Sequence, residues 1–142
     1  MALRQEAERV ATKERILSKV LTEFVLDRDS LPDALGWRLA ARLGRSSVPE
    51  QDLRELVRDA FLEEPALLET VCRDLRAVRE RDPACNDYLS PFLYFKGFQS
   101  LVGYRAANHL WRNDRLELAQ YLQSLIAAVY AVDIHPAATI GS

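Results

Sequence analysis

Apolar residues recur every three or four positions along most of this 142-residue chain. Between residues 30 and 44, for example, Leu35, Leu39 and Leu43 follow one another at steps of four. Positions with this spacing share one face of an α-helix, whereas a half-buried strand needs apolar residues at alternate positions. The spacing therefore predicts an all-α fold, a helical bundle in which each helix buries an apolar stripe.

Prolines and short polar side chains mark where these helices begin. Ser30 stands two positions before Pro32, so the serine can cap a helix whose first turn holds the proline. Ser90 and Pro91 repeat this arrangement later in the chain. Together with the spacing, such signals predict about six helices, over residues 6–26, 30–44, 49–61, 65–80, 90–111 and 114–131.

The composition is that of a folded protein with no excess of either charge. Nineteen Lys and Arg residues face 21 Asp and Glu, which leaves a formal charge of −2 and no basic excess for binding nucleic acid. Apolar residues make up 49% of the chain and charged residues 28%, as in ordinary globular proteins. The longest apolar run, residues 125–132, is far shorter than the roughly 20 residues that cross a bilayer. We therefore expect neither a nucleic-acid partner nor a membrane.

The sequence also lacks a cysteine motif for a metal or disulfide framework and a secretory signal. Cys72 and Cys85 form neither a CxxC motif nor a cluster with histidine, so we expect no metal site and no disulfide framework. Residues 1–10 are charged and lack the apolar core of a secretory signal. The sequence therefore predicts a cytoplasmic protein.

The last predicted helix starts at a capping-box pair, Asp114 and Glu117, and is apolar on nearly every face. One of its stripes consists of Leu118, Leu122, Leu125 and Val129. A second stripe consists of Ala119, Ile126 and Tyr130. A helix that is apolar all round must be covered on several sides. We expect the chain's own bundle to cover the first stripe and a second copy of the chain to cover the second, which means self-association through the helices.

The character of the sequence changes after the last helix. Ile134 and Ile140 stand six positions apart, with small residues between them and Gly141 after the second. A six-residue period with one aliphatic residue per return is typical of a left-handed parallel β-helix, which is stable only when several coils stack. We therefore divide the chain into a helical domain, residues 1–131, and the first turn of a β-helix, residues 132–142, that is cut off where the sequence ends.

Five strings occur in the chain in one order. They are RDPA at residues 81–84, PFLYFKGF at 91–98, YR at 104–105, LW at 110–111 and DIHPAA at 133–138. Together they resemble the N-terminal region of bacterial serine O-acetyltransferases, from about residue 76 to the end of the chain. No single string is diagnostic, and the combination of the DPA loop, the LYFKGF helix and the IHPAA entry carries the resemblance.

The resemblance implies a two-part enzyme, with an all-helical N-terminal domain followed by a left-handed β-helix that binds acetyl-CoA. Such an enzyme holds no bound cofactor and transfers the acetyl group of this co-substrate to the hydroxyl of L-serine, giving O-acetylserine for cysteine biosynthesis. Its β-helices form trimers, and its helical domains join two trimers into a hexamer. The family's C-terminal tail, which docks on cysteine synthase, is missing here, so that partner is expected for the complete enzyme only.

By the same resemblance, the catalytic residues lie outside this chain. The family's general base is a His–Asp pair on a later coil of the β-helix, and the CoA groove also lies beyond residue 142. We therefore assign no catalytic or metal-binding residue, leave the cofactor-binding residues open, and expect the 142-residue chain alone to be inactive. The alternative is a non-catalytic helical oligomerisation module. Further six-residue repeats with an Asp-His pair after Ser142 would distinguish the enzyme from the module.

One functional residue, Asp82, carries over from the family. The Asp of the family's DPA string lies in the serine pocket, and a carboxylate held in an irregular loop by Pro83 can meet the ammonium group of serine. The alternative is that Asp82 only turns the chain, as Asp before Pro often does. The chain departs from the family pattern at Asn86, Gln99 and Asn108, where the family often has Asp, His and His. These departures bear on packing and not on the reaction.

The remaining polar candidates have structural interpretations. His135 has no partner acid in reach, and we expect it at the corner where the last helix meets the β-helix. His109 is expected at the surface or in an interface. The basic stretch 73–81, which Asp74 interrupts, is expected to be a solvated helix face. Arg105 could contact a phosphate or a carboxylate, but nothing in the spacing demands it.

Overall fold

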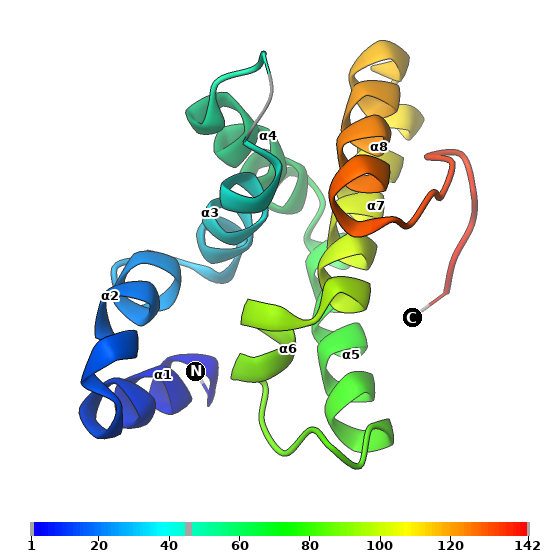
Figure 1. Cartoon of the computed structure of the whole chain (residues 1–142). Coiled ribbons are helices and arrows are strands. Elements are labelled where there is room, and N and C mark those ends of the chain that lie inside the picture. Colours follow the sequence, from blue (N-terminus) through cyan, green and yellow to red (C-terminus); the bar gives the residue numbers. More distant parts are fainter. Residues whose placement is uncertain (1, 45–46, 142) are drawn as a thin grey trace.

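The computed structural model describes residues 2–44 and 47–141, and every regular element within them is helical (Figure 1). The α-helices of these residues are α1 (Ala2–Lys13), α2 (Ser18–Leu21), α3 (Leu31–Leu43), α4 (Glu50–Glu63), α5 (Pro65–Arg81), α6 (Leu89–Tyr94), α7 (Lys96–Arg112) and α8 (Leu116–Tyr130). A 3-10 turn, η1 (Arg15–Leu17), precedes α2, and a π-helical turn, η2 (Thr22–Leu26), follows it. The predicted all-α bundle is confirmed.

Two helix pairs form the frame of this bundle. α3 packs along α4, and α7 packs along α8. α6 contacts both α1 and α5, and so joins the start of the chain to its middle (Figure 1). Residues 132–141, which we call the C-terminal segment, follow α8 without regular structure and lie beside α7 and α8 (Figure 1).

Two glycines allow these pairs to approach closely. A Cβ atom at Gly36 in α3 would lie 2.5 Å from the backbone oxygen of Arg54 in α4. A Cβ atom at Gly103 in α7 would lie 2.6 Å from Cδ1 of Ile126 in α8. Both distances are well inside van der Waals contact. A larger residue at Gly36 would push the helices apart, whereas a larger residue at Gly103 would require the Ile126 side chain to move.

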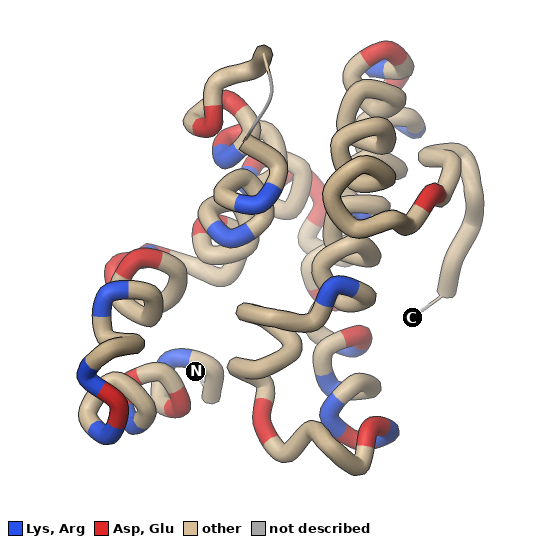
Figure 2. The backbone as a smooth tube through the Cα atoms, viewed as in Figure 1, with Lys and Arg blue, Asp and Glu red and all other residues tan. Residues whose placement is uncertain are grey.

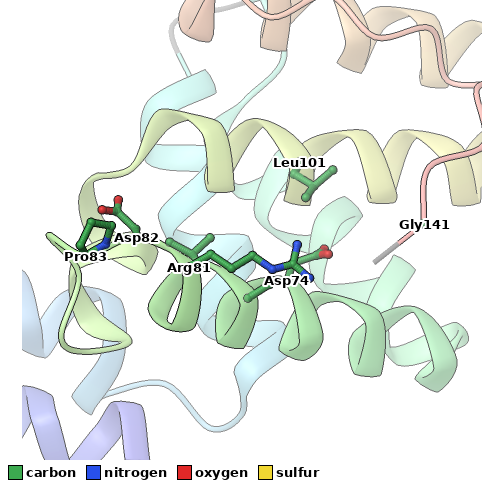
Figure 3. A pocket seen from close by; sticks show the side chains of 8 residues that line it. Asp74, Arg81, Asp82, Pro83, Leu101 and Gly141 are labelled. Carbon is green, nitrogen blue, oxygen red and sulfur yellow. The ribbon is translucent and has the colours of Figure 1, made fainter.

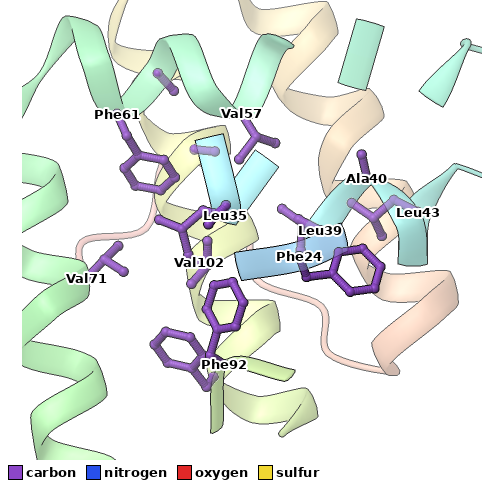
Figure 4. Packing of buried hydrophobic residues seen from close by; sticks show 14 of the residues in the cluster. Phe24, Leu35, Leu39, Ala40, Leu43, Val57, Phe61, Val71, Phe92 and Val102 are labelled. Atoms are coloured by element: carbon purple, nitrogen blue, oxygen red, sulfur yellow. The ribbon is translucent and has the colours of Figure 1, made fainter. Parts of the chain in front are cut away.

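The apolar core is shared by helices from the whole length of the chain. In Figure 4 the rings of Phe24, Phe61 and Phe92 come from η2, α4 and α6, and Leu39 and Val102 lie among them. Phe61 and Phe92 are each only 1% exposed. The sequence-distant helices are therefore held together chiefly by burial of these apolar side chains.

The predicted helix over residues 6–26 is broken. Glu14 has an extended backbone (φ −120°, ψ 90°), which ends α1. The break leaves α1 free to turn toward α6, where Oε2 of Glu6 accepts the backbone amides of Tyr88 and Leu89, both at 2.9 Å. The apolar spacing continues through the break, so the spacing alone could not show it.

The predicted helix over residues 90–111 is also two helices, because Phe95 has an extended backbone (φ −80°, ψ 112°) between α6 and α7. The Gln99 side chain donates to the carbonyl oxygens of Phe92 and Leu93, at 3.1 and 2.8 Å. These bonds satisfy backbone groups that α6 leaves open at its end. The bundle therefore has more and shorter helices than the six predicted.

The predicted helix caps have different outcomes. The Ser30 cap is confirmed, because its hydroxyl oxygen accepts the Asp33 amide at 3.3 Å. The Ser90 cap is wrong: α6 begins one residue earlier, and the Ser90 amide itself donates to Oδ1 of Asp87 at 2.7 Å. The Asp114 cap is also wrong, since Asp114 adopts a left-handed backbone (φ 60°) and its side chain caps no amide of α8.

The bundle buries the second stripe of α8, which was predicted to need a second copy of the chain, together with Leu122 of the first stripe. The buried residues of this helix are Ala119, Leu122, Ile126 and Tyr130. Leu118 and Leu125 are half-buried, and Val129 is 37% exposed. Periodicity showed that two apolar stripes exist, but only the close approach of Ile126 to Gly103 determines which stripe faces α7.

Charged side chains are spread over the longer helices, with the exception of α8 (Figure 2). In that helix Glu117 is the one acidic or basic residue. Near α2, the Trp37 ring lies between the guanidinium groups of Arg28 and Arg54, which are 3.8 and 3.9 Å from the ring centroid.

Within residues 2–44 and 47–141, no helix combines the length and apolar character that a bilayer crossing requires.

Candidate functional site

Asp82 stands where α5 ends. Its backbone is extended (φ −94°, ψ 109°), as expected for a residue before proline. The Asp82 amide donates to the Val78 carbonyl at 3.0 Å, and Oδ1 accepts the Ala84 amide at 2.9 Å. The turn therefore holds one carboxylate oxygen, while Oδ2 has no partner in the part of the chain that the structure describes.

Asp82 borders an open groove of about 610 Å³, which we call the α5–α7 groove (Figure 3). Its lining residues are Asp74, Ala77, Val78, Arg81, Asp82, Pro83, Leu101 and Gly141. They come from α5, from the turn that follows it, from α7 and from the C-terminal segment. In Figure 3, Asp82 and Gly141 lie on opposite sides of the groove, so the turn and the C-terminal segment both form its walls.

A buried ion pair lies beside this groove. Nε and Nη2 of Arg105 donate to Oδ2 and Oδ1 of Asp74, at 2.6 and 2.9 Å, and each side chain is only 4% exposed. The same guanidinium donates to the carbonyl oxygens of Ile140 and Gly141, at 3.2 and 3.0 Å. Arg105 of α7 thus connects α5 to the C-terminal segment.

The predicted solvated position of Asp74 is therefore wrong. Asp74 lies on the inner face of α5, next to buried Leu75 and three positions after buried Val71. A carboxylate within an apolar stripe is a signal that the sequence contains, because such a group needs a cation when it is buried. The sequence does not contain the identity of that cation, since Arg105 is 31 positions away.

Two further side chains of α7 bind the C-terminal segment. The Tyr104 hydroxyl donates to the carbonyl oxygen of Ala138. The Asn108 side-chain amide donates to the carbonyl oxygen of Pro136 at 2.8 Å. Positions 104 and 108 share one face of α7, so this face carries a row of donors for an extended backbone.

His135 occupies a structural position in the C-terminal segment. Its ring meets Trp111 of α7 edge-on, with 4.8 Å between the ring centroids. Its Nδ1 accepts the Ala137 amide at 3.0 Å, which places the ring proton of the neutral form on Nε2. His135 is not among the residues that line the α5–α7 groove.

His109 is buried within the chain, so the prediction that it lies at the surface or in an interface is wrong. Its Nδ1 lies 2.8 Å from Oε2 of Glu64, and its Nε2 lies 2.8 Å from Oε2 of Glu63. A carboxylate only accepts, so both contacts are hydrogen bonds at once only when each ring nitrogen carries a proton. Arg112 donates to the same Glu64 oxygen at 2.8 Å and to Oδ1 of Asn108 at 2.7 Å.

This charged cluster perturbs Glu64 and links the α4–α5 junction to the C-terminal segment. The hydrogen bond from Arg112, supported by the one from His109, lowers the pKa of the Glu64 carboxyl in spite of its partial burial. The link passes from Glu64 through Arg112 to Asn108, and Asn108 in turn binds Pro136. The cluster therefore helps to hold the row of donors on α7 in place.

The lining of the α5–α7 groove includes the carboxylates of Asp74 and Asp82 and the guanidinium group of Arg81, and it lacks a histidine that could serve as a base. Among its lining residues, Asp74 is neutralised by Arg105, so Asp82 offers the carboxylate oxygen that remains open to a ligand. Among the described residues, no three His, Cys, Asp or Glu side chains gather closely enough to hold a metal ion.

Comparison with known proteins identifies the family. The chain matches the family model described as "Serine acetyltransferase, N-terminal" over residues 1–102. It is 39% identical to the serine acetyltransferase of Haemophilus influenzae over 139 residues, which cover 98% of this chain and 52% of that protein. It is 37% identical to the serine acetyltransferase of Escherichia coli K12 over 139 residues, which cover 98% of this chain and 51% of that protein. The chain spans about half the length of these curated relatives.

The same relationship holds for solved structures. A serine acetyltransferase in complex with CoA superimposes with a TM-score of 0.95 at 38% identity, over 99% of this chain and 59% of that one. A soybean serine acetyltransferase complexed with serine superimposes with a TM-score of 0.90 at 41% identity, over 96% of this chain and 56% of that one. Because the family model covers more than half of the sequence, and because the helical fold agrees, this chain belongs to the serine acetyltransferase N-terminal family.

Proposed function

We propose that this chain is the helical part of a serine O-acetyltransferase, which transfers the acetyl group of acetyl-CoA to the hydroxyl of L-serine and gives O-acetylserine for cysteine biosynthesis. The family membership supports this proposal, as do relatives solved with CoA and with serine. The single observation that carries it within this chain is the Asp82 carboxylate, held by its own turn at the wall of the α5–α7 groove with Oδ2 open.

In the proposed site, Asp82 binds the ammonium group of serine. A charge-assisted hydrogen bond to a fixed carboxylate is short and about twice as strong as a neutral one. Holding the amine in this way directs the hydroxyl of serine toward the thioester, and such orientation contributes several kcal/mol to catalysis. The ester C–O bond then forms, the C–S bond of the thioester breaks, and the CoA thiolate leaves and takes up the proton that a general base has accepted from the serine hydroxyl.

The proton of the serine hydroxyl must go to a general base, which we expect on residues outside this chain. The proposal therefore assigns the α5–α7 groove to substrate binding and assigns no catalytic or CoA-binding residue within residues 1–142. It also keeps the division into a helical domain, residues 1–131, and the first turn of a β-helix, residues 132–142. A cytoplasmic location belongs to the same proposal.

Self-association through the helices is a further part of the proposal. The less buried side of α8, with Leu118 and Leu125 half-buried and Val129 37% exposed, supports it. Covering this stripe with a second copy of the chain is favourable at roughly 25 cal/mol per Å² of apolar surface. In the complete enzyme this contact would join two trimers, and cysteine synthase is a partner of the complete enzyme only.

The test is an Asp82→Asn variant of the complete protein, in which the chain continues as its gene encodes. We expect the serine KM to rise roughly tenfold or more and the acetyl-CoA KM to stay unchanged, because the carboxylate meets the amino acid alone. Glu80→Gln, which makes the same charge change two residues earlier on the exposed side of α5, serves as the control and should leave both values unchanged.

Two outcomes would contradict this proposal. An equal rise in the KM values for serine and acetyl-CoA would show that Asp82 has a folding role. A complete protein without any turnover would favour the alternative function, the non-catalytic oligomerisation module. The purified 142-residue chain provides a second check. Mixed with acetyl-CoA and serine, it should release no CoA above background, and measurable release would place the general base within residues 1–142.

A further inference from the structure

One guanidinium group connects both walls of the α5–α7 groove. Arg105 holds Asp74 through two nitrogens and the carbonyl oxygens of Ile140 and Gly141 through Nη1 and Nη2. Asp74 and Asp82 are eight positions apart on α5 and the turn that ends it, which is about two helical turns or 12 Å. The C-terminal segment is thus tied to the same helix that presents Asp82.

The energetics of the pair favour a positioning role over a purely stabilising one. Taking two charges out of water costs about as much as their attraction returns, so apolar residues of similar size would give equal stability. Apolar residues could not bind two backbone carbonyls in one geometry. The planar fork of Arg105 can, because its donors are fixed relative to one another.

Within residues 2–44 and 47–141, Arg105 is the side chain that donates to the carbonyl oxygens of Ile140 and Gly141. Tyr104 and Asn108 bind the carbonyl oxygens of residues 136 and 138, which are farther from the groove. Arg105 binds those of Ile140 and Gly141, and Gly141 lines the groove opposite Asp82.

We propose that Asp74 and Arg105 form a positioning pair that sets the distance between Asp82 and the backbone of residues 140–141. The pair thereby fixes where the chain that follows Gly141 starts relative to the substrate carboxylate. The consequence for catalysis rests on the proposed function, whereas the placement of the segment can be measured in the 142-residue chain without any activity.

The first experiment measures ¹⁵N backbone order parameters of Thr139, Ile140 and Gly141. In the wild-type chain we expect values near 0.85, as for rigid backbone. In the double variant Asp74→Asn/Arg105→Gln, which removes both buried charges together, we expect values below about 0.6 at these positions. Flexible residues 139–141 in the wild type, or unchanged values in the variant, would overturn the positioning pair.

Two matched variants keep this experiment decisive. Arg105→Lys keeps a cation opposite Asp74 but cannot hold the carboxylate and two carbonyls in one plane, so it should also lower the order parameters. If the double variant fails to fold, the order parameters of Arg105→Lys still test whether the pair positions residues 139–141. Arg58→Lys makes the same change in a half-buried pair with Asp59 on α4 and should alter nothing at residues 139–141.

The second experiment is a double-mutant cycle in the complete protein. Arg105→Lys should raise the serine KM roughly tenfold, since small displacements of a bound substrate are costly. In the Asp82→Asn background the same change should add little, because both substitutions then disturb one alignment. If Arg105→Lys raises the serine KM by the same factor in both backgrounds, Arg105 acts independently of Asp82. If Asp82→Asn alone leaves the serine KM unchanged, the proposed function fails, and the order parameters still decide the positioning pair.

Discussion

The carboxylate of Glu6 accepts the backbone amide of Leu89 at 2.9 Å, although 83 positions separate the two residues. The same oxygen accepts the amide of Tyr88 at 2.9 Å. These amides lie at the start of α6, where the first turn of a helix has no carbonyl partners of its own. A side chain from the first helix thus caps the amides of Tyr88 and Leu89, while the neighbouring Asp87 accepts the amide of Ser90.

Removal of this cap should destabilise the whole bundle. We expect Glu6→Ala to lower the free energy of unfolding by about 1–2 kcal/mol, because two partly buried amides lose a charged acceptor. Glu8→Ala, which removes an exposed carboxylate paired with Arg4 two positions along the same helix, should cost less than about 0.5 kcal/mol. Urea denaturation of both variants measures the difference, and equal losses would contradict the capping role.

Two tyrosines should respond in opposite ways to the loss of their hydroxyl groups. The Tyr130 hydroxyl is buried and has no hydrogen-bond partner among the described residues, so Tyr130→Phe should raise the free energy of unfolding by up to about 1 kcal/mol. The Tyr104 hydroxyl donates to Ala138, so Tyr104→Phe should lower it by about 1 kcal/mol. Thermal unfolding of the two variants at neutral pH makes the comparison.

A pH titration of tyrosine absorbance checks the burial of the Tyr130 hydroxyl independently. Burial raises the pKa of Tyr130 to about 12. The absorbance change of this phenol should therefore come at a higher pH than that of an exposed tyrosine, and it should be missing from the titration curve of Tyr130→Phe. A Tyr130 that ionises near pH 10 would show that its hydroxyl reaches water.

The pH dependence of stability should contain a contribution from Glu64. Its pKa is lowered in the folded protein, chiefly by Arg112, so the folded state binds the proton less readily than the unfolded chain. The stabilisation is fully present above the ordinary pKa of a glutamate and is lost as the pH falls through the lowered folded pKa. Glu64→Gln should therefore weaken the loss of stability in acid.

The control for this prediction is Glu69→Gln, because Glu69 is exposed on α5. At neutral pH, Glu64→Gln should cost roughly 1–2 kcal/mol, since it replaces the charged acceptor of Arg112 and His109. The Glu69 variant should follow the wild-type curve throughout. Parallel acid unfolding curves for the wild type and Glu64→Gln would contradict the assignment.

The glycine in the α3–α4 contact should not tolerate a methyl group. Gly36→Ala places a Cβ 2.5 Å from the Arg54 carbonyl oxygen, and we expect a net loss of about 1–3 kcal/mol. Gly97→Ala meets nothing within 4 Å in the first turn of α7 and should stabilise the protein by up to about 1 kcal/mol through helix propensity. The denaturation midpoints of the two variants test whether Gly36→Ala destabilises the protein and whether Gly97→Ala stabilises it.

Features that depend on neighbouring residues could be predicted from the sequence. The Ser30 cap and the start of α5 at Pro65 are local, because a hydroxyl or a fixed φ acts within one turn. The position of Asp82 at a helix end also follows from the proline beside it. The helical fold and the candidate ligand-binding carboxylate were therefore accessible, although the role of Asp82 is still a prediction.

Features that depend on distant partners could not be predicted. The position of Asp74 in an apolar stripe did not identify Arg105 as its partner, and the spacing of α8 gave no indication of which stripe faces α7. His109 was misplaced for the same reason, because Glu63 and Glu64 are more than 40 positions away. In each case the choice is made by packing between helices, which periodicity within one helix does not contain.

The edge-on contact between Trp111 and His135 gives the C-terminal segment an optical signal of its own. The other indole, Trp37, lies between Arg28 and Arg54 and reports on α3 and α4 instead. In a Trp37→Phe variant, the remaining tryptophan emission therefore follows whether residues 132–141 lie against α7. Stopped-flow fluorescence of that variant can time the docking of the segment separately from the folding of the bundle.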